Sequence, residues 1–434
     1  MAKAFKRSLM QAPKGFRDIL PADQKYYEFV KQVAIKHLRF SGFKRIDLPV
    51  LEYASLFARG VGEETDIVEK EMFIVERKNK TEEKEEYAMR PEGTAGVARA
   101  YIEHGMHTKA QPVMLYYVGP FFRYDQPQEG RYREFWQLGA EILGTAKPTA
   151  DIELMRVAWN IFEDLGITDI SLSINSIGCP HCHPNVTKSL GEFFTLNKSK
   201  LCPDCKNRLS KNVFRILDCK EPKCKEVAAE APPILDTLCV YCKNHLRKVL
   251  EMLDELKIKY DLDPTLARGL DYYTRTVFEI SMSEDKERKL TLAGGGRYDV
   301  LIKNLGGRET PAVGFAIGID RIVDVLKNKE IEVPDYEKPT VFLIQLGETA
   351  KKACYQTLEK LQSEGIPTQA TPFKDSLKAQ LRTANRLHVR FAVIVGQKEM
   401  NDKTVIVRDM KESVQEIVPH AELINYLKNK LKKD

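Results

Sequence analysis

The chain has 434 residues, of which 43% are hydrophobic and 30% are charged, a balance typical of a soluble protein with a hydrophobic core. This length predicts two or three domains, and no apolar run approaches the roughly 18 residues that a membrane span needs, so we expect no membrane partner. The first twenty residues are basic and lack the apolar core of a secretory signal, which predicts a cytoplasmic protein. The net charge of +6 permits a nucleic-acid partner without requiring one, and nine cysteines in a cytoplasmic chain argue against a disulfide framework.

The N-terminal part carries helix and strand signals in turn. Residues 22–40 have apolar side chains at helical spacing and stop before Gly42, which predicts an amphipathic helix with a glycine C-cap. FKRIDLPVLE then predicts a strand closed by Pro49, a position typical of an edge or an interface. The highly charged residues 76–86 predict a solvated hairpin loop. AMRPEGTAGVARAYI predicts a strand end that enters a helix, with Pro91 in the first turn.

An antiparallel hairpin is the most informative predicted element. VMLYYVGPFFRY and REFWQLGAEILG flank the polar loop DQPQEGRY. Strand alternation places four residues on one face of the second strand: Phe135, Gln137, Gly139 and Glu141. Arg123 lies on the partner strand. Because the glycine has no side chain, we expect space for a ligand between an amide and a carboxylate. The alternative is an exposed polar sheet face.

Beyond a helix predicted at 150–168, residues 169–258 differ in composition and hold eight of the nine cysteines. LARGLDYYTRTVFEI follows at 266–280. We predict a loop through Arg268 to Asp271 and a half-buried strand from about Tyr272, with Phe278 and Ile280 on one face and Val277 on the other. LAGGGRYD and AVGFAIGIDRIVDVL come next, the latter a strand that runs into a helix.

The C-terminal residues predict a separate α/β domain. A linker at 331–338 is charged and contains proline. Strand and helix signals alternate over 339–434, including helices near 348–363 and 375–387. Four basic residues at a spacing of four would form a helical face able to follow phosphates, although a simply solvated face is the alternative: Lys374, Lys378, Arg382 and Arg386.

The cysteines form pairs. Three are C-x2-C pairs and the fourth is wider: Cys179 with Cys182, Cys202 with Cys205, Cys239 with Cys242, and Cys219 with Cys224. Paired knuckles with this spacing predict zinc in a cytoplasmic chain, and eight thiols could close two tetrahedral structural sites. Which pairs combine cannot be read from the spacing, and free thiols without metal are the alternative.

These motifs together resemble those of the histidyl-tRNA synthetases, a class II aminoacyl-tRNA synthetase family. FRYDQPQEGRYREFWQLGAEILG resembles motif 2, GFKRIDLPVLE motif 1 and AVGFAIGIDRI motif 3, while RGLDYY and LAGGGRYD resemble the histidine-specific motifs. The resemblance implies an α+β fold, with a class II antiparallel-sheet catalytic domain over 1–330, interrupted by a cysteine-rich insertion at 169–258, and an anticodon-binding domain at 339–434. It implies a homodimer that acts on L-histidine, ATP with Mg²⁺, and tRNA(His). Many members of the family lack the cysteines.

The same resemblance implies roles for individual residues. The expected histidine-binding residues are Glu92, Gly93, Thr94, Arg123, Gln137, Glu141, Arg268, Tyr272 and Tyr273. The expected ATP-binding residues are Arg123, Arg131, Tyr132, Phe135 and Arg321. Arg268, Arg123 and Gln137 are the expected catalytic residues. The two arginines would stabilise charge on the reacting phosphoryl group, and Gln137 would hold the histidine carboxylate or its reactive oxygen.

The proposed imidazole contacts also follow from physical chemistry. A neutral imidazole has one donor nitrogen and one acceptor nitrogen. A carboxylate such as Glu141 accepts from the first, and a phenol such as Tyr273 donates to the second. Other functions were weighed: a regulatory paralogue without charging activity, a sensor module for uncharged tRNA, and a zinc-dependent nucleic-acid binder. The tail domain and the imidazole-reading residues argue against the first, and intact Arg123, Arg268 and Arg321 argue against the second. The third would leave RPEGT, Glu141 and RGLDYY unexplained.

Overall fold

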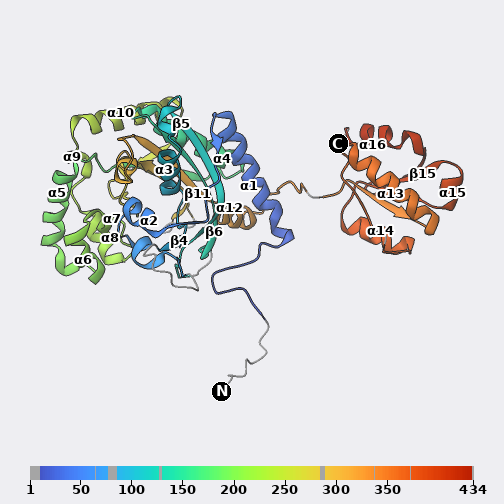
Figure 1. Ribbon diagram of the computed structural model, residues 1–434, viewed down its shortest axis with the longest axis horizontal. Helices are drawn as coiled ribbons and strands as arrows, with labels where there is room; N and C mark the ends of the chain where they lie inside the picture. Colours follow the sequence, from blue (N-terminus) through green and yellow to red (C-terminus); the bar gives the residue numbers. More distant parts are fainter. Residues whose placement is uncertain are drawn as a thin grey trace, which may run out of the picture. The chain divides into compact units, whose positions relative to one another are not determined.

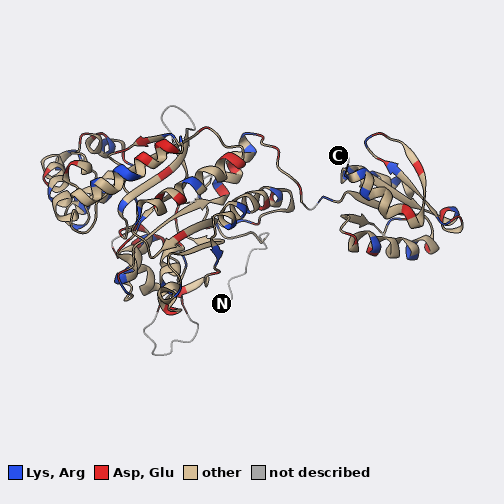
Figure 2. Ribbon diagram, turned by 90° about the horizontal axis from the view of Figure 1, so that it is seen from above, with Lys and Arg blue, Asp and Glu red and all other residues tan. Residues whose placement is uncertain are grey.

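The computed structural model describes residues 10–63, 65–76, 86–126, 130–283, 289–336, 338–371 and 373–432. The chain divides into two compact units, Met1–Val333 and Pro334–Asp434, which are described separately (Figure 1). The boundary falls within the predicted linker at 331–338. Within the described residues, no helix combines the length and the apolarity needed to cross a bilayer. Figure 2 shows basic and acidic residues interspersed over the ribbons of both units.

An eight-stranded sheet forms the centre of the first unit. In spatial order its strands are β1 (Lys44–Arg45), β5 (Val113–Phe122), β6 (Glu134–Leu143), β11 (Ala312–Gly318), β10 (Lys289–Arg297), β9 (Thr274–Ser283), β7 (Ile170–Ser176) and β8 (Tyr260–Leu262). The pairs β1–β5 and β7–β8 are parallel, and the other neighbours are antiparallel. The predicted hairpin is confirmed as β5 and β6.

Both faces of the sheet are covered. Apolar side chains of α1 (Pro21–Phe40), α4 (Pro148–Asp164) and α12 (Ile319–Asn328) pack on one face, together with Phe278 and Ile280 of β9 (Figure 1). Val277 packs in the core on the opposite face. The predicted opposite directions of these side chains are therefore confirmed, but the half-buried strand is wrong, because all three side chains are 0% exposed.

The remaining elements of the first unit lie mostly on the second face. They are the strands β2 (Leu51–Tyr53), β3 (Ile74–Val75) and β4 (Tyr87–Met89), which form a small sheet in the order β2-β4-β3, and the helices α2 (Ala54–Val61), η1 (Ile67–Glu71), α3 (Thr94–Glu103), η2 (Met106–Thr108), α5 (His183–Leu196), η3 (Lys198–Lys200), α6 (Pro203–Lys211), α7 (Phe214–Leu217), α8 (Pro222–Ala229), α9 (Ile234–Thr237), α10 (Val240–Glu255) and α11 (Leu301–Asn304).

Two predictions for the N-terminal part were wrong. The single strand expected through Pro49 is split into β1 and β2, because each part pairs with a different sheet. Pro91 does not lie in the first turn of a helix, since α3 begins only at Thr94. The predicted loop at 76–86 lies outside the described residues except at its two ends.

The edges of the cysteine-rich region also differ from the expected 169–258. β7 belongs to the central sheet, where it pairs with β9 over Ile170–Ser176. At the other end, α10 buries Leu246, Val249 and Leu253 in the same core as α4. The region that stands apart from the sheet therefore begins after β7, because the apolar side chains at both ends complete the main core.

The second unit is an α/β domain, as predicted, built on a five-stranded sheet. Its strands, in spatial order, are β13 (Thr368–Ala370), β12 (Val341–Gln345), β14 (Phe391–Val395), β15 (Thr404–Asp409) and β16 (Gln415–Pro419), and its helices are α13 (Glu348–Ser363), α14 (Leu377–Arg386), α15 (Gln397–Asn401), η4 (His420–Glu422) and α16 (Leu423–Leu431). β16 was not predicted. Lys374 precedes α14, and its ammonium donates to Thr383 Oγ1 at 3.0 Å, so it does not extend the basic helical face.

Candidate active site

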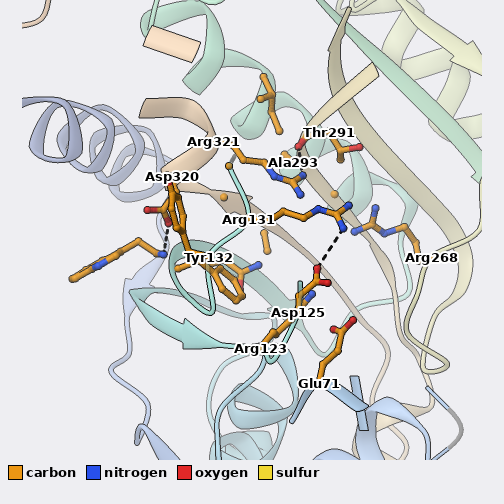
Figure 3. A pocket seen from close by; sticks show the side chains of 18 of the residues that line it. Glu71, Arg123, Asp125, Arg131, Tyr132, Arg268, Thr291, Ala293, Asp320 and Arg321 are labelled. Atoms are coloured by element: carbon orange, nitrogen blue, oxygen red, sulfur yellow. Dashed lines mark hydrogen bonds and ion pairs between the residues drawn. The ribbon is translucent and has the colours of Figure 1, made fainter. Parts of the chain in front are cut away.

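A polar cavity of about 300 Å³ lies over the start of β6 and the start of α12 (Figure 3). Four arginines from separate segments line it, and we call them the four-arginine cluster: Arg123, Arg131, Arg268 and Arg321. Burial lowers the pKa of Arg321, and the positive charges of the other three lower it further. Three carboxylates of the same wall, Glu71, Asp125 and Asp320, only partly balance these charges, so the cavity suits an anionic ligand.

Each arginine is held by a specific partner. Arg321 Nη1 donates to the Thr291 carbonyl at 2.8 Å, and Arg123 Nε donates to the Pro91 carbonyl at 2.9 Å. Arg131 pairs with Asp125 at 3.3 Å, and Arg268 forms an ion pair with Glu279. In Figure 3 the guanidinium groups of Arg131, Arg268 and Arg321 lie close together. Such fixed planar cations suit phosphate oxygens.

An aromatic wall adjoins the cluster. Tyr132, Phe135 and Trp136 line the cavity. Arg17 lies over the Tyr132 ring at 3.6 Å from its centroid and pairs with Asp320 at 2.7 Å. Asp320 also accepts from the Trp136 amide at 2.6 Å, so it fixes both the cation and the strand beside it.

A second group of polar side chains is fully buried next to this cavity. The Glu141 carboxylate, 0% exposed, accepts hydrogen bonds from Tyr298 Oη at 2.6 Å and from Thr94 Oγ1 at 2.8 Å. Burial raises the pKa of Glu141 from 4.5 to about 8, although the Tyr298 and Thr94 hydrogen bonds oppose the rise. A carboxyl balanced near neutral pH by burial and hydrogen bonds is typical of functional sites.

The space that the sequence predicts over Gly139 is occupied. A Cβ added at Gly139 would collide with the ring of Tyr117, and so would one added at Gly93. The two glycines therefore make room for a buried phenol rather than for a ligand directly. Burial raises the pKa of Tyr117 well above its usual value, with Glu141 and Glu92 adding to the effect.

Glu92 caps a helix. Its carboxylate accepts from the backbone amides of Thr94 at 2.6 Å and Ala95 at 2.8 Å, at the start of α3. Burial raises its pKa, and these amides oppose the rise. A fixed, buried carboxylate beside Thr94 is suited to an ammonium group.

The segment from Arg268 to Tyr273 is irregular, as predicted, but β9 begins at Thr274 rather than at Tyr272. Cβ atoms added at Gly294 and Gly296 would collide with the Arg268 guanidinium and the Tyr273 ring, respectively. Two glycines on β10 thus make room for two side chains that arrive from one loop. The arginine points into the cavity, and the phenol lies in the buried group.

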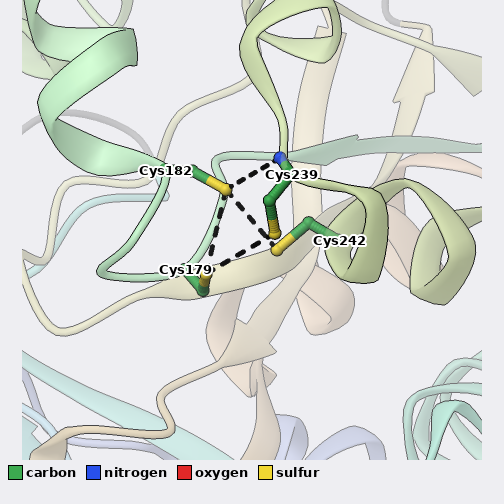
Figure 4. A group of neighbouring side chains, drawn as sticks. All are labelled: Cys179, Cys182, Cys239 and Cys242. Atoms are coloured by element: carbon green, nitrogen blue, oxygen red, sulfur yellow. Dashed lines mark hydrogen bonds between the residues drawn. The ribbon is translucent and has the colours of Figure 1, made fainter.

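The eight paired cysteines form two clusters. The first cysteine cluster is Cys179, Cys182, Cys239 and Cys242, and the second is Cys202, Cys205, Cys219 and Cys224. In the first cluster, Cys182 Sγ lies 3.8 Å from both Cys179 Sγ and Cys242 Sγ, and Cys179 Sγ lies 4.0 Å from Cys239 Sγ. Figure 4 shows the four side chains gathered together. In the second, Cys202 and Cys219 are 3.9 Å apart. A tetrahedral zinc ion with bonds of about 2.3 Å separates its sulfur ligands by about 3.8 Å, so the thiols fit that metal.

Comparison with known proteins identifies the family. A family model described as histidyl-tRNA synthetase matches residues 15–322, and one described as anticodon binding domain matches residues 340–430. The chain is 46% identical to a histidine–tRNA ligase of Dehalococcoides mccartyi, over 98% of this chain and 100% of that one. The chain belongs to the histidyl-tRNA synthetase family.

One solved structure and a second sequence relative agree with this assignment. The apo S. aureus histidyl-tRNA synthetase superposes with a TM-score of 0.81 at 31% identity, covering 96% of this chain and 99% of that chain. The histidine–tRNA ligase of Caldicellulosiruptor saccharolyticus is 43% identical over 97% of this chain and 100% of that one. The predicted family and the α+β class II fold with a C-terminal anticodon-binding domain are thus confirmed.

The structure brings together most of the residues that the family resemblance singled out. Seven of them line the cavity: Arg123, Arg131, Tyr132, Phe135, Gln137, Arg268 and Arg321. The others are not among its described lining residues, and all of them are buried: Glu92, Gly93, Thr94, Glu141, Tyr272 and Tyr273. Gln137 Oε1 is buried without a hydrogen-bond partner among the described residues, at the junction between the two groups.

Side chains at the site that were missed from the sequence include Arg17, Tyr117, Tyr298 and Asp320. Two signals were available. Tyr298 follows the glycine run of LAGGGRYD, and Asp320 precedes the motif 3 arginine. Arg17 and Tyr117 carried no local signal, because their contacts are made with residues distant in sequence.

Proposed function

We propose that the chain activates L-histidine with ATP to form histidyl-adenylate and pyrophosphate, and then transfers the histidyl group to the 3′ end of tRNA(His) for translation. The observation that carries this proposal is the four-arginine cluster beside a buried carboxylate and phenols, in a chain of this family. The cluster suits a triphosphate, and the buried group suits a ring with one donor and one acceptor nitrogen.

In the activation step, a histidine carboxylate oxygen attacks the α-phosphorus, a new P–O bond forms, and the bond to the β-phosphate oxygen breaks. Arg123 and Arg268 hold the charge on the phosphoryl oxygens, and Gln137 orients the carboxylate. Arg131, Tyr132, Phe135 and Arg321 hold the rest of ATP. When bound, Mg²⁺ neutralises phosphate charge, and Glu71 and Asp125 offer carboxylate oxygens in the cavity wall.

Histidine is recognised at the buried end of the site. Glu92 and Thr94 hold its ammonium group, with Gly93 between them. Glu141 accepts from the imidazole N–H, Tyr273 donates to the other ring nitrogen, and Tyr272 lines the pocket. An amino acid without these nitrogens would leave Glu141 and Tyr273 buried and unpaired, a penalty that can discriminate by roughly 10⁴ to 10⁵.

In the transfer step, a hydroxyl of the terminal ribose attacks the carbonyl carbon and AMP leaves. A phosphate oxygen of the adenylate takes the proton. We further propose a cytoplasmic homodimer with Pro49 at its interface, a catalytic domain over 1–330 interrupted by the cysteine-rich region, and a C-terminal domain that binds the anticodon.

Both cysteine clusters hold structural zinc in this proposal. Four thiolates fill the tetrahedral positions, so none is left open for catalysis. Backbone amides also donate toward the sulfurs, from Cys239 to Cys182 Sγ and from Cys202 to Cys224 Sγ, each at 3.2 Å. Such bonds stabilise thiolates. Metal analysis of the purified protein should give two zinc ions per chain, and a metal-free folded protein would contradict this part.

The test is histidine-dependent ATP–pyrophosphate exchange, followed by charging of tRNA(His). Arg268→Ala should slow exchange about a hundredfold or more, because a cation at the phosphoryl group is lost. Arg247→Ala is the matched control, since its side chain on α10 is 65% exposed and pairs only with Glu251 in the described contacts. Absence of exchange in well-folded wild-type protein would overturn the proposal.

A further inference from the structure

Of the described residues that line the active-site cavity, only Lys220 comes from the cysteine-rich region. It directly follows Cys219 of the second cysteine cluster. We propose that Lys220 is a phosphate-binding residue for the ATP polyphosphate, and that the second cysteine cluster holds it in place. This inference rests on the proposed function.

The charge of the cavity favours this role. Lys220 adds a fifth cation to the wall that holds the four-arginine cluster. The carboxylates of Glu71 and Asp125 share that wall. Burial raises the pKa of Glu71, while the positive charges of Arg123 and Lys220 both act to lower it. Lys220 is therefore close enough to act electrostatically within the site, and it is exposed.

The segment that carries Lys220 is fastened to the catalytic core. Arg215, whose side chain is 8% exposed, donates to the Gly269 carbonyl at 3.2 Å and to Asp66 at 2.9 Å. Arg208 also donates to Asp66, at 3.1 Å. Burial would raise the pKa of Asp66, but Arg215, Arg208 and Lys70 together hold the pKa below its usual value.

The second cysteine cluster closes this segment on itself. Cys219 ends the turn after α7, where its amide donates to the Ile216 carbonyl at 3.2 Å, and its sulfur lies 3.9 Å from Cys202. The neighbouring Asp218 carboxylate lies against Gly269, beside Arg268, where an added Cβ would be 3.7 Å away. One turn, pinned by one sulfur, thus brings Lys220 to the cavity and Asp218 to the loop of Arg268.

Lys223 provides a matched control. It also lies next to a cysteine of the second cluster, Cys224, and it is exposed on α8. It is not among the described residues that line the cavity. Replacement of either lysine by alanine removes one positive charge beside the same cluster, so only a direct phosphate contact distinguishes them.

The experiment is calorimetric titration of full-length wild-type protein, Lys220→Ala, Lys220→Arg and Lys223→Ala with ATP and Mg²⁺, and with adenosine as a phosphate-free probe. Lys220→Ala should raise the Kd for ATP about fivefold to tenfold, as expected for one partly solvated ionic contact. It should leave the Kd for adenosine unchanged. Lys220→Arg should restore most of the ATP affinity, and Lys223→Ala should match wild type. The difference should shrink as salt is raised.

A second arm tests the role of the cluster. Cys202→Ser should weaken ATP binding by a similar factor, and the double variant with Lys220→Ala should bind no worse than either single variant. Circular dichroism, and the zinc ion expected to remain in the first cysteine cluster, serve to check that the rest of the protein is folded. If Lys220→Ala binds ATP as wild type does, the inference is wrong while the proposed function stands. If wild type binds no ATP, both fail.

Discussion

The Tyr298 hydrogen bond favours the ionised form of Glu141 against the effect of burial, and the substitution Tyr298→Phe should show how much it contributes. The phenol donates to Glu141 Oε2 at 2.6 Å in a fully buried setting. The pKa of Glu141 is about 8, so about a tenth of the carboxyls are ionised at pH 7 before ligand binds. A hydrogen bond to a charged group contributes about 1.5–3 kcal/mol. Its loss should therefore lower the carboxylate population, and raise the Kd for histidine, roughly tenfold to a hundredfold at pH 7.

The pH dependence separates this mechanism from a simple packing defect. Titration calorimetry with L-histidine at pH 7 and pH 8.5 gives the ratio of the variant Kd to the wild-type Kd. Protonation of the free histidine changes both Kd values equally, so it does not affect this ratio. Glu141 in wild type is mostly ionised at pH 8.5, whereas the variant still gains carboxylate there. The ratio should therefore narrow about threefold between the two pH values. Tyr116→Phe is the control, because the Tyr116 hydroxyl has no hydrogen-bond partner among the described residues. A ratio that stays constant with pH would refute the reasoning.

Three further substitutions have definite outcomes. Glu141 holds its proton up to about pH 8 when the protein is folded but only up to about pH 4.5 when it is unfolded. Its contribution to the free energy of unfolding therefore falls by about 1.4 kcal/mol per pH unit between these values. Thermal unfolding of Glu141→Gln should show a gain in stability over wild type that grows with pH. Arg297→Met should destabilise the first unit by about 3–5 kcal/mol in denaturant unfolding. The reason is that the Asp151 carboxylate, 0% exposed and 2.9 Å from the Arg297 guanidinium, loses its main charge partner. An unchanged denaturant midpoint would show that this ion pair does not stabilise the fold. Glu279→Ala should slow pyrophosphate exchange about tenfold, because it releases Arg268. The double variant Glu279→Ala with Arg268→Ala should be no slower than Arg268→Ala alone. Additive losses would show that the two residues act separately.

Local patterns predicted the fold well where one element depends on its own sequence. α13 runs over the predicted 348–363, and the hairpin of β5 and β6 follows from two alternating runs around a polar loop. The errors came from long-range packing. β7 was assigned to the cysteine-rich region because its neighbours in sequence are there, although its partner in space is β9. β9 was predicted half-buried because alternation does not show that a second layer covers the other face.

The pairing of the cysteines shows the same limit. Spacing identified four pairs but not their combination, since any two pairs could supply four ligands. In the structure the first pair meets the last, Cys239 and Cys242, some sixty residues later, and the two middle pairs meet each other. The two clusters are therefore nested along the chain, with the second lying wholly within the loop that the first closes.

The glycines of the site carry the most general lesson. From the sequence, Gly139 predicts space for a ligand. In the structure Gly139 makes room for Tyr117, Gly294 for Arg268 and Gly296 for Tyr273. A glycine in a buried strand lets another part of the chain approach closely, and here the approaching group is a side chain that we expect to touch substrate. Any larger residue at these positions would displace the arginine or the phenol rather than the ligand itself. The glycines therefore fix the positions of Arg268 and Tyr273, and these two side chains shape the site. In the proposed function, this is how two residues five apart in one loop would contact the phosphate and the imidazole.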